Sequence, residues 1–250
     1  MTITKAITIT SDGGSGEGGI LASGTNGITV NAGAADVVKI SGLFIHGGTP
    51  LAPGLNGIRF IAGGALHVRN TVIVNFASTA VGNGNGILFA PSGASELFVT
   101  DTFISESGIN GILIQPTGSG SAKAAIIRTN AVNSTAGIRS DGTGSSGGIN
   151  VSIQDSVVSG NTNAGVTVFN PVGGPAINVM VQGVAAVNNG VPGGLRVDGA
   201  NATMRVGSSI VSGNGTGTAI LNGGVISSYG NNQINGNTAD GPNPPTIPLK

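Results

Sequence analysis

The sequence predicts an all-β solenoid in which a coil of three short strands repeats along one axis. One observation is a recurring phrase: "NGITV" at Asn26–Val30 returns as "NGILF" at Asn85–Phe89 and "NGILI" at Asn110–Ile114. Another is a β-branched phrase, such as "LHVRNTVIV", that keeps a constant place between successive copies of the first. The third is composition, because 46 glycines with 8% charged and 39% apolar residues indicate an ordered, turn-rich chain rather than a disordered one.

The first strand of each coil is predicted to start at an anchor residue. The anchors recur about every 27 residues, within the range of solenoid repeats, at Gly27, Gly57, Gly86, Gly111, Gly137, Gly165, Gly194 and Thr218. Apolar residues after each anchor alternate with period two, which is typical of strands. Since the pleat sends alternate side chains to opposite faces, the expected core pairs are Ile28/Val30, Ile58/Phe60, Ile87/Phe89, Ile112/Ile114, Val166/Val168 and Leu195/Val197.

The second and third strands of each coil lie in the β-branched phrase. The same alternation predicts inward second-strand residues at Ile40, Val68, Val99, Ile127, Ile153, Val181 and Val206. It predicts inward third-strand residues at Ile45, Ile73, Ile104, Val132, Val158, Ala186, Val211 and Ile234. These columns would stack like residues on like along the axis.

Asparagines recur at one predicted turn, and the end of the chain changes character. Asn161, Asn189, Asn214 and Asn237 are expected to form a structural ladder, because stacked amides can bond the backbone and one another. The segment "ADGPNPPTIPLK" holds four prolines, which cannot donate to a strand ladder. We therefore expect one solenoid domain over residues 1–238 and an extended proline-rich tail over residues 239–250.

The phased "NGI" and β-branched phrases resemble those of the right-handed parallel β-helix of pectate-lyase-like proteins, and most of all its uncharacterised bacterial members. The resemblance extends from Ile3 to Asn237. It implies a single right-handed, three-sided solenoid of about eight coils of roughly 23–31 residues. It also implies an extracellular or cell-surface location. It does not imply one activity, since this fold carries lyases, hydrolases, adhesins and binding modules.

Composition narrows the partners. The formal net charge is zero, so the chain lacks the basic footprint of a nucleic-acid or anionic-membrane binder. Cysteine is absent, which excludes disulfides and thiolate metal sites. No apolar run is long enough to span a membrane, and the opening "MTITKAITIT" lacks the apolar stretch of a signal peptide. We expect neither nucleic acid nor a membrane span.

Two Arg-x-Asp pairs are the candidate catalytic residues. Arg139 with Asp141, and Arg196 with Asp198, are predicted to share the outer face of the first strand, two coils apart. The resemblance to pectate lyases offers a role for them as a proton-abstracting base beside bound calcium. Calcium prefers six to eight oxygen ligands, however, and one aspartate per coil supplies too few. We therefore expect exposed ion pairs, with no metal and no cofactor; calcium enters only under the lyase alternative.

The preferred hypothesis is a non-catalytic structural or interaction solenoid. Two alternatives stay open: a polysaccharide lyase or glycoside hydrolase of the pectate-lyase-like type, and a glycan-binding module. Aromatic residues make up only 3% of the chain, with no tryptophan, so the broad aromatic faces that suit sugars are scarce. Polysaccharide nevertheless remains a candidate partner.

An apolar column on the third strand is the candidate surface for self-association. Its members precede the inward residues: Phe44, Val72, Phe103, Ala131, Val157, Ala185 and Ile210, with Phe98, Ile126 and Met180 outward on the second strand nearby. Aligned exposed apolar residues form a patch of the kind that meets a partner. The alternative is that a bend at the corner turns the column inward as a second core row.

Overall fold

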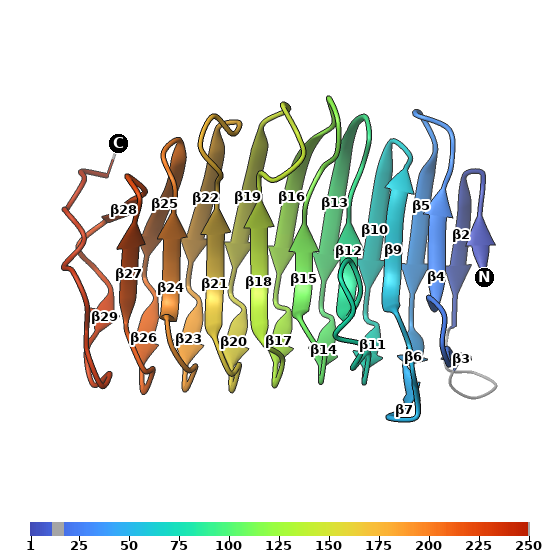
Figure 1. The fold of residues 1–250 in the computed structure, drawn as a ribbon, viewed down its shortest axis with the longest axis horizontal. Coiled ribbons are helices and arrows are strands. Elements are labelled where there is room, and N and C mark those ends of the chain that lie inside the picture. Colours follow the sequence, from blue (N-terminus) through green and yellow to red (C-terminus); the bar gives the residue numbers. More distant parts are fainter. Residues whose placement is uncertain (12–17, 250) are drawn as a thin grey trace.

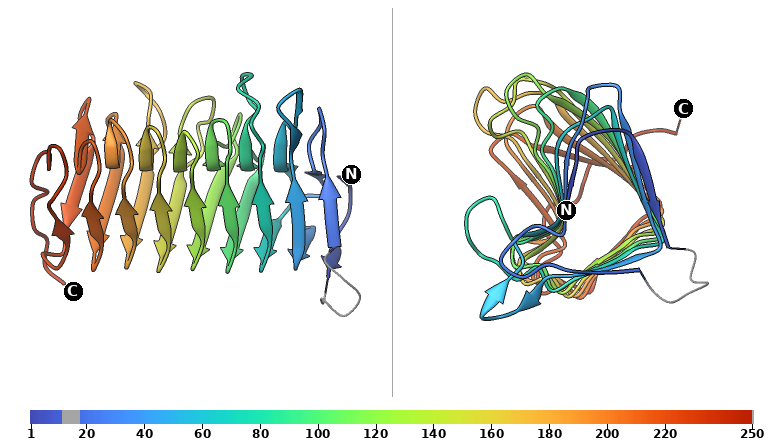
Figure 2. Two further views of the ribbon diagram at one scale, coloured as in Figure 1. Left: turned by 90° about the horizontal axis from the view of Figure 1, so that it is seen from below. Right: turned by 90° about the vertical axis from the view of Figure 1, so that its right-hand side faces the viewer.

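The computed structural model describes residues 1–11 and 18–249, and these form a three-sided parallel β-helix. The chain rises along the front sheet in Figure 1, crosses at the top, descends behind, and returns at the bottom one step further from the N-terminus. That path is right-handed. The end-on view in Figure 2 shows the coils superimposed as a three-sided tube. The prediction of an all-β, right-handed, three-sided solenoid is confirmed, and the described residues contain no helix.

Three nine-stranded parallel sheets form the sides of the tube in the described part of the chain, which makes about eight turns. Sheet 1 contains β1 (Thr2–Ile3), β4 (Ile28–Asn31), β9 (Asn56–Ala62), β12 (Asn85–Phe89), β15 (Asn110–Ile114), β18 (Ala136–Asp141), β21 (Ala164–Phe169), β24 (Gly193–Asp198) and β27 (Thr218–Leu221). Sheet 2 contains β2 (Ile7–Thr10), β5 (Val37–Ser41), β10 (Ala65–Arg69), β13 (Ala94–Thr100), β16 (Ser121–Ile127), β19 (Ile149–Gln154), β22 (Ile177–Gln182), β25 (Ala202–Gly207) and β28 (Val225–Ser228).

Sheet 3 is built from the shortest strands. It contains β3 (Gly18–Leu21), β6 (Leu43–His46), β11 (Val72–Val74), β14 (Phe103–Ser105), β17 (Asn130–Val132), β20 (Val157–Ser159), β23 (Ala185–Val187), β26 (Ile210–Ser212) and β29 (Gln233–Ile234). One antiparallel hairpin, β7 (Gly48–Thr49) with β8 (Ala52–Pro53), projects from the tube between β6 and β9.

The corner between sheets 2 and 3 is a tight turn with a repeated design. Its first residue has a positive φ, for example 47° at Asn70 and 51° at Asp101, a conformation that Asn and Asp tolerate better than most residues. The next residue is often a buried Thr or Ser whose hydroxyl donates to the carbonyl two residues earlier, as Thr102 does to Thr100 at 2.9 Å. Short polar residues at this corner therefore satisfy the backbone that a sharp bend would leave unpaired.

The core is a set of aliphatic columns inside the tube. Every predicted first-strand pair from Ile28/Val30 to Leu195/Val197 is buried. Phe60 and Phe89 stack across adjacent coils with ring centroids 4.6 Å apart, close to the spacing between neighbouring strands. Most predicted inward residues of the other two sheets are also buried, so the alternation argument holds along most of the rod.

The fifth coil departs from the predicted register by one residue. Val99 pairs with Ile126 and Ile104 pairs with Ala131, so Ile126 and Ala131 are buried while Ile127 and Val132 face outward. The predicted inward positions of Ile127 and Val132 are therefore wrong, as are the predicted outward positions of Ile126 and Ala131. A one-residue slip exchanges the inward and outward faces of a strand. Because Ala124–Ile127 is apolar on both faces, its pattern does not distinguish the two registers.

The last anchor is also displaced by one residue. Leu195 pairs with Thr218, which places Thr218 in the inward column that follows the anchors. Gly217 accepts a hydrogen bond at 3.0 Å from Leu195 N and therefore holds the anchor position that the sequence assigned to Thr218.

The asparagine ladder is present, and a second one accompanies it. Asn161 Nδ2 donates to Asn189 Oδ1 and Asn189 Nδ2 to Asn214 Oδ1, both at 2.9 Å, and Asn214 Nδ2 donates to Asn237 Oδ1 at 2.8 Å. In the N-terminal half a separate ladder joins the asparagines at the starts of the first strands, namely Asn26, Asn56, Asn85 and Asn110. Each half of the rod thus carries its own buried amide ladder.

The proline-rich segment runs across the C-terminal end of the tube. Thr218 Oγ1 donates to Pro242 O at 2.6 Å, Ser228 N to Pro245 O at 2.9 Å, and Ile247 N to Ser228 O at 2.8 Å. The segment is extended and lies against the last strands of sheets 1 and 2. Lys250 lies outside the described residues.

Candidate functional site

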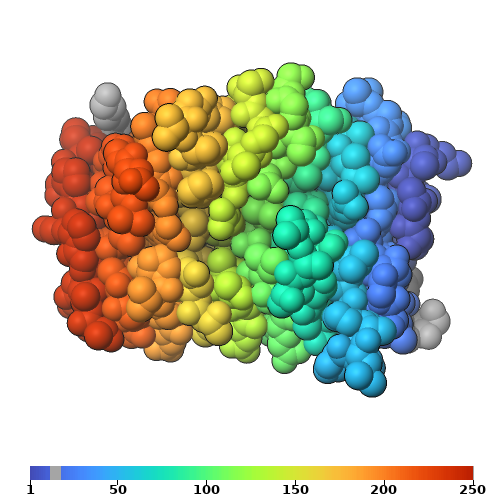
Figure 3. Space-filling model, in the orientation of Figure 1, coloured from blue at the N-terminus to red at the C-terminus, as the bar shows by residue number. Residues whose placement is uncertain are grey.

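The two Arg–Asp pairs lie on the outer face of sheet 1, where the sequence predicted them. Arg139 Nη2 lies 2.7 Å from Asp141 Oδ2, and Arg196 Nη2 lies 2.6 Å from Asp198 Oδ2. Strand β21 separates them, with Thr167 in register between the arginines and Phe169 between the aspartates. Figure 3 shows this face, from which the segment between β11 and β12 also projects.

Both aspartates are buried and already fully engaged. Asp141 Oδ1 accepts the Thr143 backbone N–H at 2.8 Å, and Asp198 Oδ1 accepts Asn222 Nδ2 at 2.7 Å. The Arg139 guanidinium also lies 5.2 Å from the centre of the Phe169 ring. We expected exposed ion pairs, but only 3% of Asp141 and 5% of Asp198 is exposed. These contacts hold the start of the loop after β18 and the residue that follows β27, and they leave neither carboxylate free to accept a proton from a substrate.

The other ionisable groups do not add to these pairs. Asp101 pairs with Arg128 at 2.7 Å at the corner between sheets 2 and 3, and hydrogen bonding to this arginine lowers the pKa of Asp101. His46 ends β6, and His67 faces outward on β10, a different side of the tube from Arg139. Among the described residues, no three His, Asp or Glu side chains are grouped as a metal site would require.

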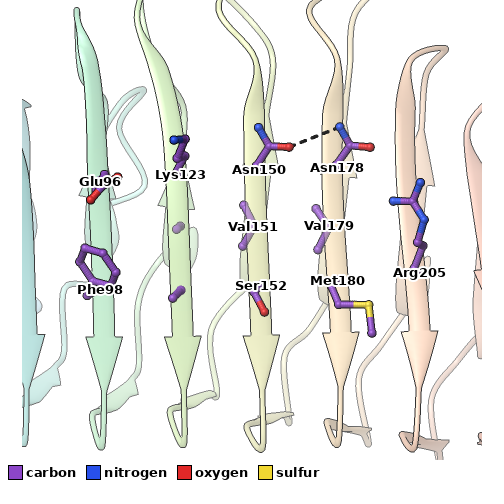
Figure 4. A pocket seen from close by; sticks show the side chains of 12 residues that line it. Glu96, Phe98, Lys123, Asn150, Val151, Ser152, Asn178, Val179, Met180 and Arg205 are labelled. Atoms are coloured by element: carbon purple, nitrogen blue, oxygen red, sulfur yellow. Dashed lines mark hydrogen bonds between the residues drawn. The ribbon is translucent and has the colours of Figure 1, made fainter. Parts of the chain in front are cut away.

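A groove on the outer face of sheet 2 is a second candidate site among the described residues (Figure 4). It has a volume of about 460 Å³ and follows the rod axis across β13, β16, β19, β22 and β25. One row of outward side chains contains Glu96, Lys123, Asn150 and Asn178, and the adjacent row contains Phe98, Ala125, Ser152, Met180 and Arg205.

The groove exists because two small residues lie between larger ones. Ala125 and Ser152 stand in register between Phe98 and Met180, so the row drops to a methyl and a hydroxymethyl group over two coils. Phe98 is held from the far side by His67, with ring centroids 4.6 Å apart and planes 18° from parallel. Partial burial, and to a smaller extent the charge of Lys39, lowers the pKa of His67, so neutral imidazole is favoured there.

The polar groups around the groove are uncommitted. Within the described residues, no hydrogen bond or ion pair engages the side chain of Glu96, Lys123 or Arg205. The amides of Asn150 and Asn178 make one long contact of 3.5 Å. A second hollow shares Met180 and Arg205 with the groove and continues it towards Tyr229 and the tail at Ile247–Leu249. Sheet 2 therefore presents unpaired charge beside apolar surface, as an interaction face would.

The third-strand column faces outward. Phe44 pairs in register with Val72, and Val72 with Phe103, and their side chains are half-buried or exposed on the outside of the tube. In the fifth coil, Asn130 rather than Ala131 occupies this column and interrupts the apolar row. The alternative of a second core row is wrong. Self-association through Phe44, Val72, Phe103, Val157 and Ile210 stays a prediction.

Comparisons with known proteins returned nothing: no family model, no curated protein and no solved structure matches this chain. The fold is thus established by the structure alone. Among the described residues, no helix has the length and apolar character needed to cross a membrane.

Sequence reasoning missed the groove. The signal was present as a row of outward positions in which Ala125 and Ser152 separate Phe98 from Met180. Recognising that row requires the correct register of the fifth coil. The predicted register was one residue out and placed Ile126 at the outward position that Ala125 occupies.

Proposed function

We propose that the protein is a non-catalytic interaction solenoid: a rigid rod that binds a partner through the outer face of sheet 2. The observation that carries this proposal is the contrast between two faces. The carboxylates of sheet 1 are buried and engaged in hydrogen bonds, whereas Glu96, Lys123 and Arg205 of sheet 2 border a groove and make no ion pair or side-chain hydrogen bond with the described residues.

The geometry gives little support to a lyase or hydrolase. Proton abstraction needs a base within hydrogen-bonding reach of the substrate, but Arg139 and Arg196 direct their guanidinium groups to their own aspartates. A two-carboxylate glycosidase needs one carboxyl that can donate a proton to the leaving group. The carboxylates of Asp141 and Asp198 instead accept hydrogen bonds, from Arg139 and Arg196 at Oδ2 and from Thr143 N and Asn222 Nδ2 at Oδ1.

The decisive assay is absorbance of unsaturated products after incubation with uronate-containing polysaccharides, with and without calcium. We expect no product under either condition. A matched variant, Arg139→Ala with Arg196→Ala, identifies the origin of any signal. Product formation that falls by several orders of magnitude in this variant would overturn the proposal and establish the lyase alternative. Binding of the same polysaccharides without turnover would instead identify glycan as the partner of the rod.

A further inference from the structure

We infer that the partner of the sheet 2 groove is a second copy of this chain, bound face to face with the two rods antiparallel and Ser152 opposite Ser152. This inference rests on the proposed function, because it treats the groove as an interaction surface. The evidence for it is the order of side chains along sheet 2: when a second copy runs in the opposite direction, its side chains complement those of the first.

A two-fold axis along the strand direction at Ser152 reverses the order of coils and preserves position along each strand. The register of β13 to β25 then sets Ala125 of one copy opposite Met180 of the other, on both sides of the axis. The thioether of Met180, a flexible side chain that fills irregular gaps, enters the space above the Ala125 methyl group. The hollow of each copy is thus filled by the other.

The charges match in the same arrangement. Phe98 and Arg205 lie two coils from Ser152 on opposite sides, so each Arg205 faces a Phe98 ring of the other copy. Glu96 is two residues before Phe98 on the same face of β13, within reach of that guanidinium. Lys123 faces Asn178, and no like charges meet.

The alternative two-fold arrangement is unfavourable. An axis along the rod places every coil opposite itself, so Arg205 would face Arg205 and Phe98 would face Phe98. Like charges at close range across an interface are repulsive. Of the two arrangements in which the rods are aligned, only the antiparallel one joins opposite charges and fills the hollow.

The face is large enough for a specific contact. From β10 to β28 it spans six steps of about 4.8 Å, and its six-residue strands are about 20 Å long, so each copy offers roughly 600 Å² of flat area. A standard interface buries about 800 Å² of accessible surface per partner, and side-chain relief raises the accessible area above the flat value. A dimer of moderate affinity is the expected product.

Charge exchange across the interface provides the test. The mass in solution is measured by sedimentation for the full chain and for Glu96→Arg, Arg205→Glu and the two together. We expect the full chain to reach twice its 24.1 kDa. Each single variant should weaken the dimer at least about tenfold, because it creates like-charge contacts, and the double variant should recover affinity. Arg59→Glu, a charge reversal on exposed sheet 1 surface, is the matched control and should leave the dimer intact.

A second variant reports on the hollow itself. Ala125→Trp fills the space that Met180 of the other copy needs, and should abolish the dimer while melting remains near that of the full chain. A chain that is monomeric at all concentrations overturns the inference. So does a dimer that survives both reversals but is lost in Phe44→Ser with Phe103→Ser, since sheet 3 would then be the interface. If the chain is a monomer without activity on polysaccharides, the dimer inference is wrong and the proposed non-catalytic function stands. If the chain is a dimer that cleaves polysaccharides, the proposed non-catalytic function is wrong and the dimer inference stands.

Discussion

Asn189 shows how a single residue holds one coil to the next. Its Oδ1 accepts both the backbone N–H and the side-chain Nδ2 of Asn161, and its own Nδ2 donates to Val158 O and Asn214 Oδ1. Only 3% of the residue is exposed, so water cannot replace these bonds. The ladder works because buried polar groups are costly only when they lack partners.

Replacement of Asn189 by alanine should therefore be severe. We expect Asn189→Ala to lower the free energy of unfolding by roughly 2–4 kcal/mol, because it leaves buried groups of Asn161, Val158 and Asn214 unpaired. Chemical denaturation monitored by circular dichroism measures the loss. Asn163→Ala is the control, since the Asn163 side chain makes no hydrogen bond to any described residue and its removal should change stability little. Equal losses of unfolding free energy in the two variants would show that the ladder hydrogen bonds of Asn189 do not stabilise the rod.

His67 makes the stability of the rod depend on pH. Burial lowers its pKa below the usual value in the folded state, so the unfolded chain binds a proton more readily. Stability should fall as the pH drops below about 6.5, the value in unfolded chains, and the fall should level off once the pH passes below the folded pKa. The melting temperature of the full chain minus that of His67→Gln, followed from pH 7.5 downward, isolates this contribution. A difference that is constant across this range would show that His67 does not titrate differently on folding.

Residue patterns predicted one amide ladder and overlooked the other. Asn161 to Asn237 stood out because they recur in "GN" or "NN" phrases, which is a turn signal. Asn26, Asn56, Asn85 and Asn110 belong to the repeated "NGI" phrase and were equally visible. They mark the repeat, and a polar residue that recurs at the same point of successive coils also predicts a stack, by the same argument as for the C-terminal ladder.

At the scale of the strand, the glycine anchors are explained by close approach of neighbouring coils. A Cβ at Gly86 would lie 2.7 Å from Gly111 O and would collide with Ile104 Cγ2. The same conflict with the next anchor's carbonyl recurs from Gly27 to Gly165. The anchors therefore repeat because each inner corner has no space for a side chain, so that sheet 1 can approach sheet 3 closely.

Gly86→Ala tests whether the anchor glycines are required because the inner corner has no space for a side chain. The added methyl group must displace either the Gly111 backbone or Ile104, and we expect a loss of roughly 3 kcal/mol in unfolding free energy, near the upper end for overpacked sites. Gly93→Ala is the matched control, because nothing lies within 4 Å of the Cβ that it would add. Urea denaturation of both variants gives the comparison, and a small loss at Gly86 would show that the coils can separate at little cost.

The register of the fifth coil shows where pattern reasoning fails for an element. Most strands alternate apolar and polar residues, which fixes their inward face. The run Ala124–Ala125–Ile126–Ile127 is apolar on both faces, so its pattern supports two registers equally. The turn that would mark the end of this strand is also disguised, since Arg128 takes the positive-φ position that Asn70 and Asp101 hold in preceding coils. Pairing with β13 and β19 decides the register, and that information lies outside the strand.

For the whole molecule, the fold was predictable and the groove was not, for one physical reason. The fold follows from a sequence repeat that recurs in about eight coils, so a wrong register in one coil does not change the predicted fold. A surface groove depends on differences between coils, such as Ala125 and Ser152 beside Phe98 and Met180, and it is lost when a single coil is misaligned. The Arg139–Asp141 and Arg196–Asp198 pairs were located correctly because first-strand alternation is unambiguous, but their burial depends on loops that have no repeat.

The two ends of a solenoid limit its stability, because each coil is held mainly by its neighbours. At the C-terminal end the tail supplies the missing neighbour: Ala239 O and Asp240 O accept from Gly217 N and Thr218 N, and Pro245 O accepts from Ser228 N. The prolines in this segment offer carbonyls to the last coil and have no N–H group to donate to a further strand. The tail therefore closes the edge strands β27 and β28 without offering a new one.

Deletion of residues 239–250 should consequently loosen one end of the rod. We expect faster amide hydrogen exchange in β27 and β28, no change in β12 and β15, and a lower melting temperature, since local opening of an end coil costs less than opening of the middle. Uncovered edges should also promote end-to-end aggregation. Deletion of residues 248–250 alone is the control, because it begins after the Ile247 N to Ser228 O hydrogen bond and keeps these contacts. Unchanged exchange in β27 and β28 after the longer deletion would show that the last coil is stable without a cap.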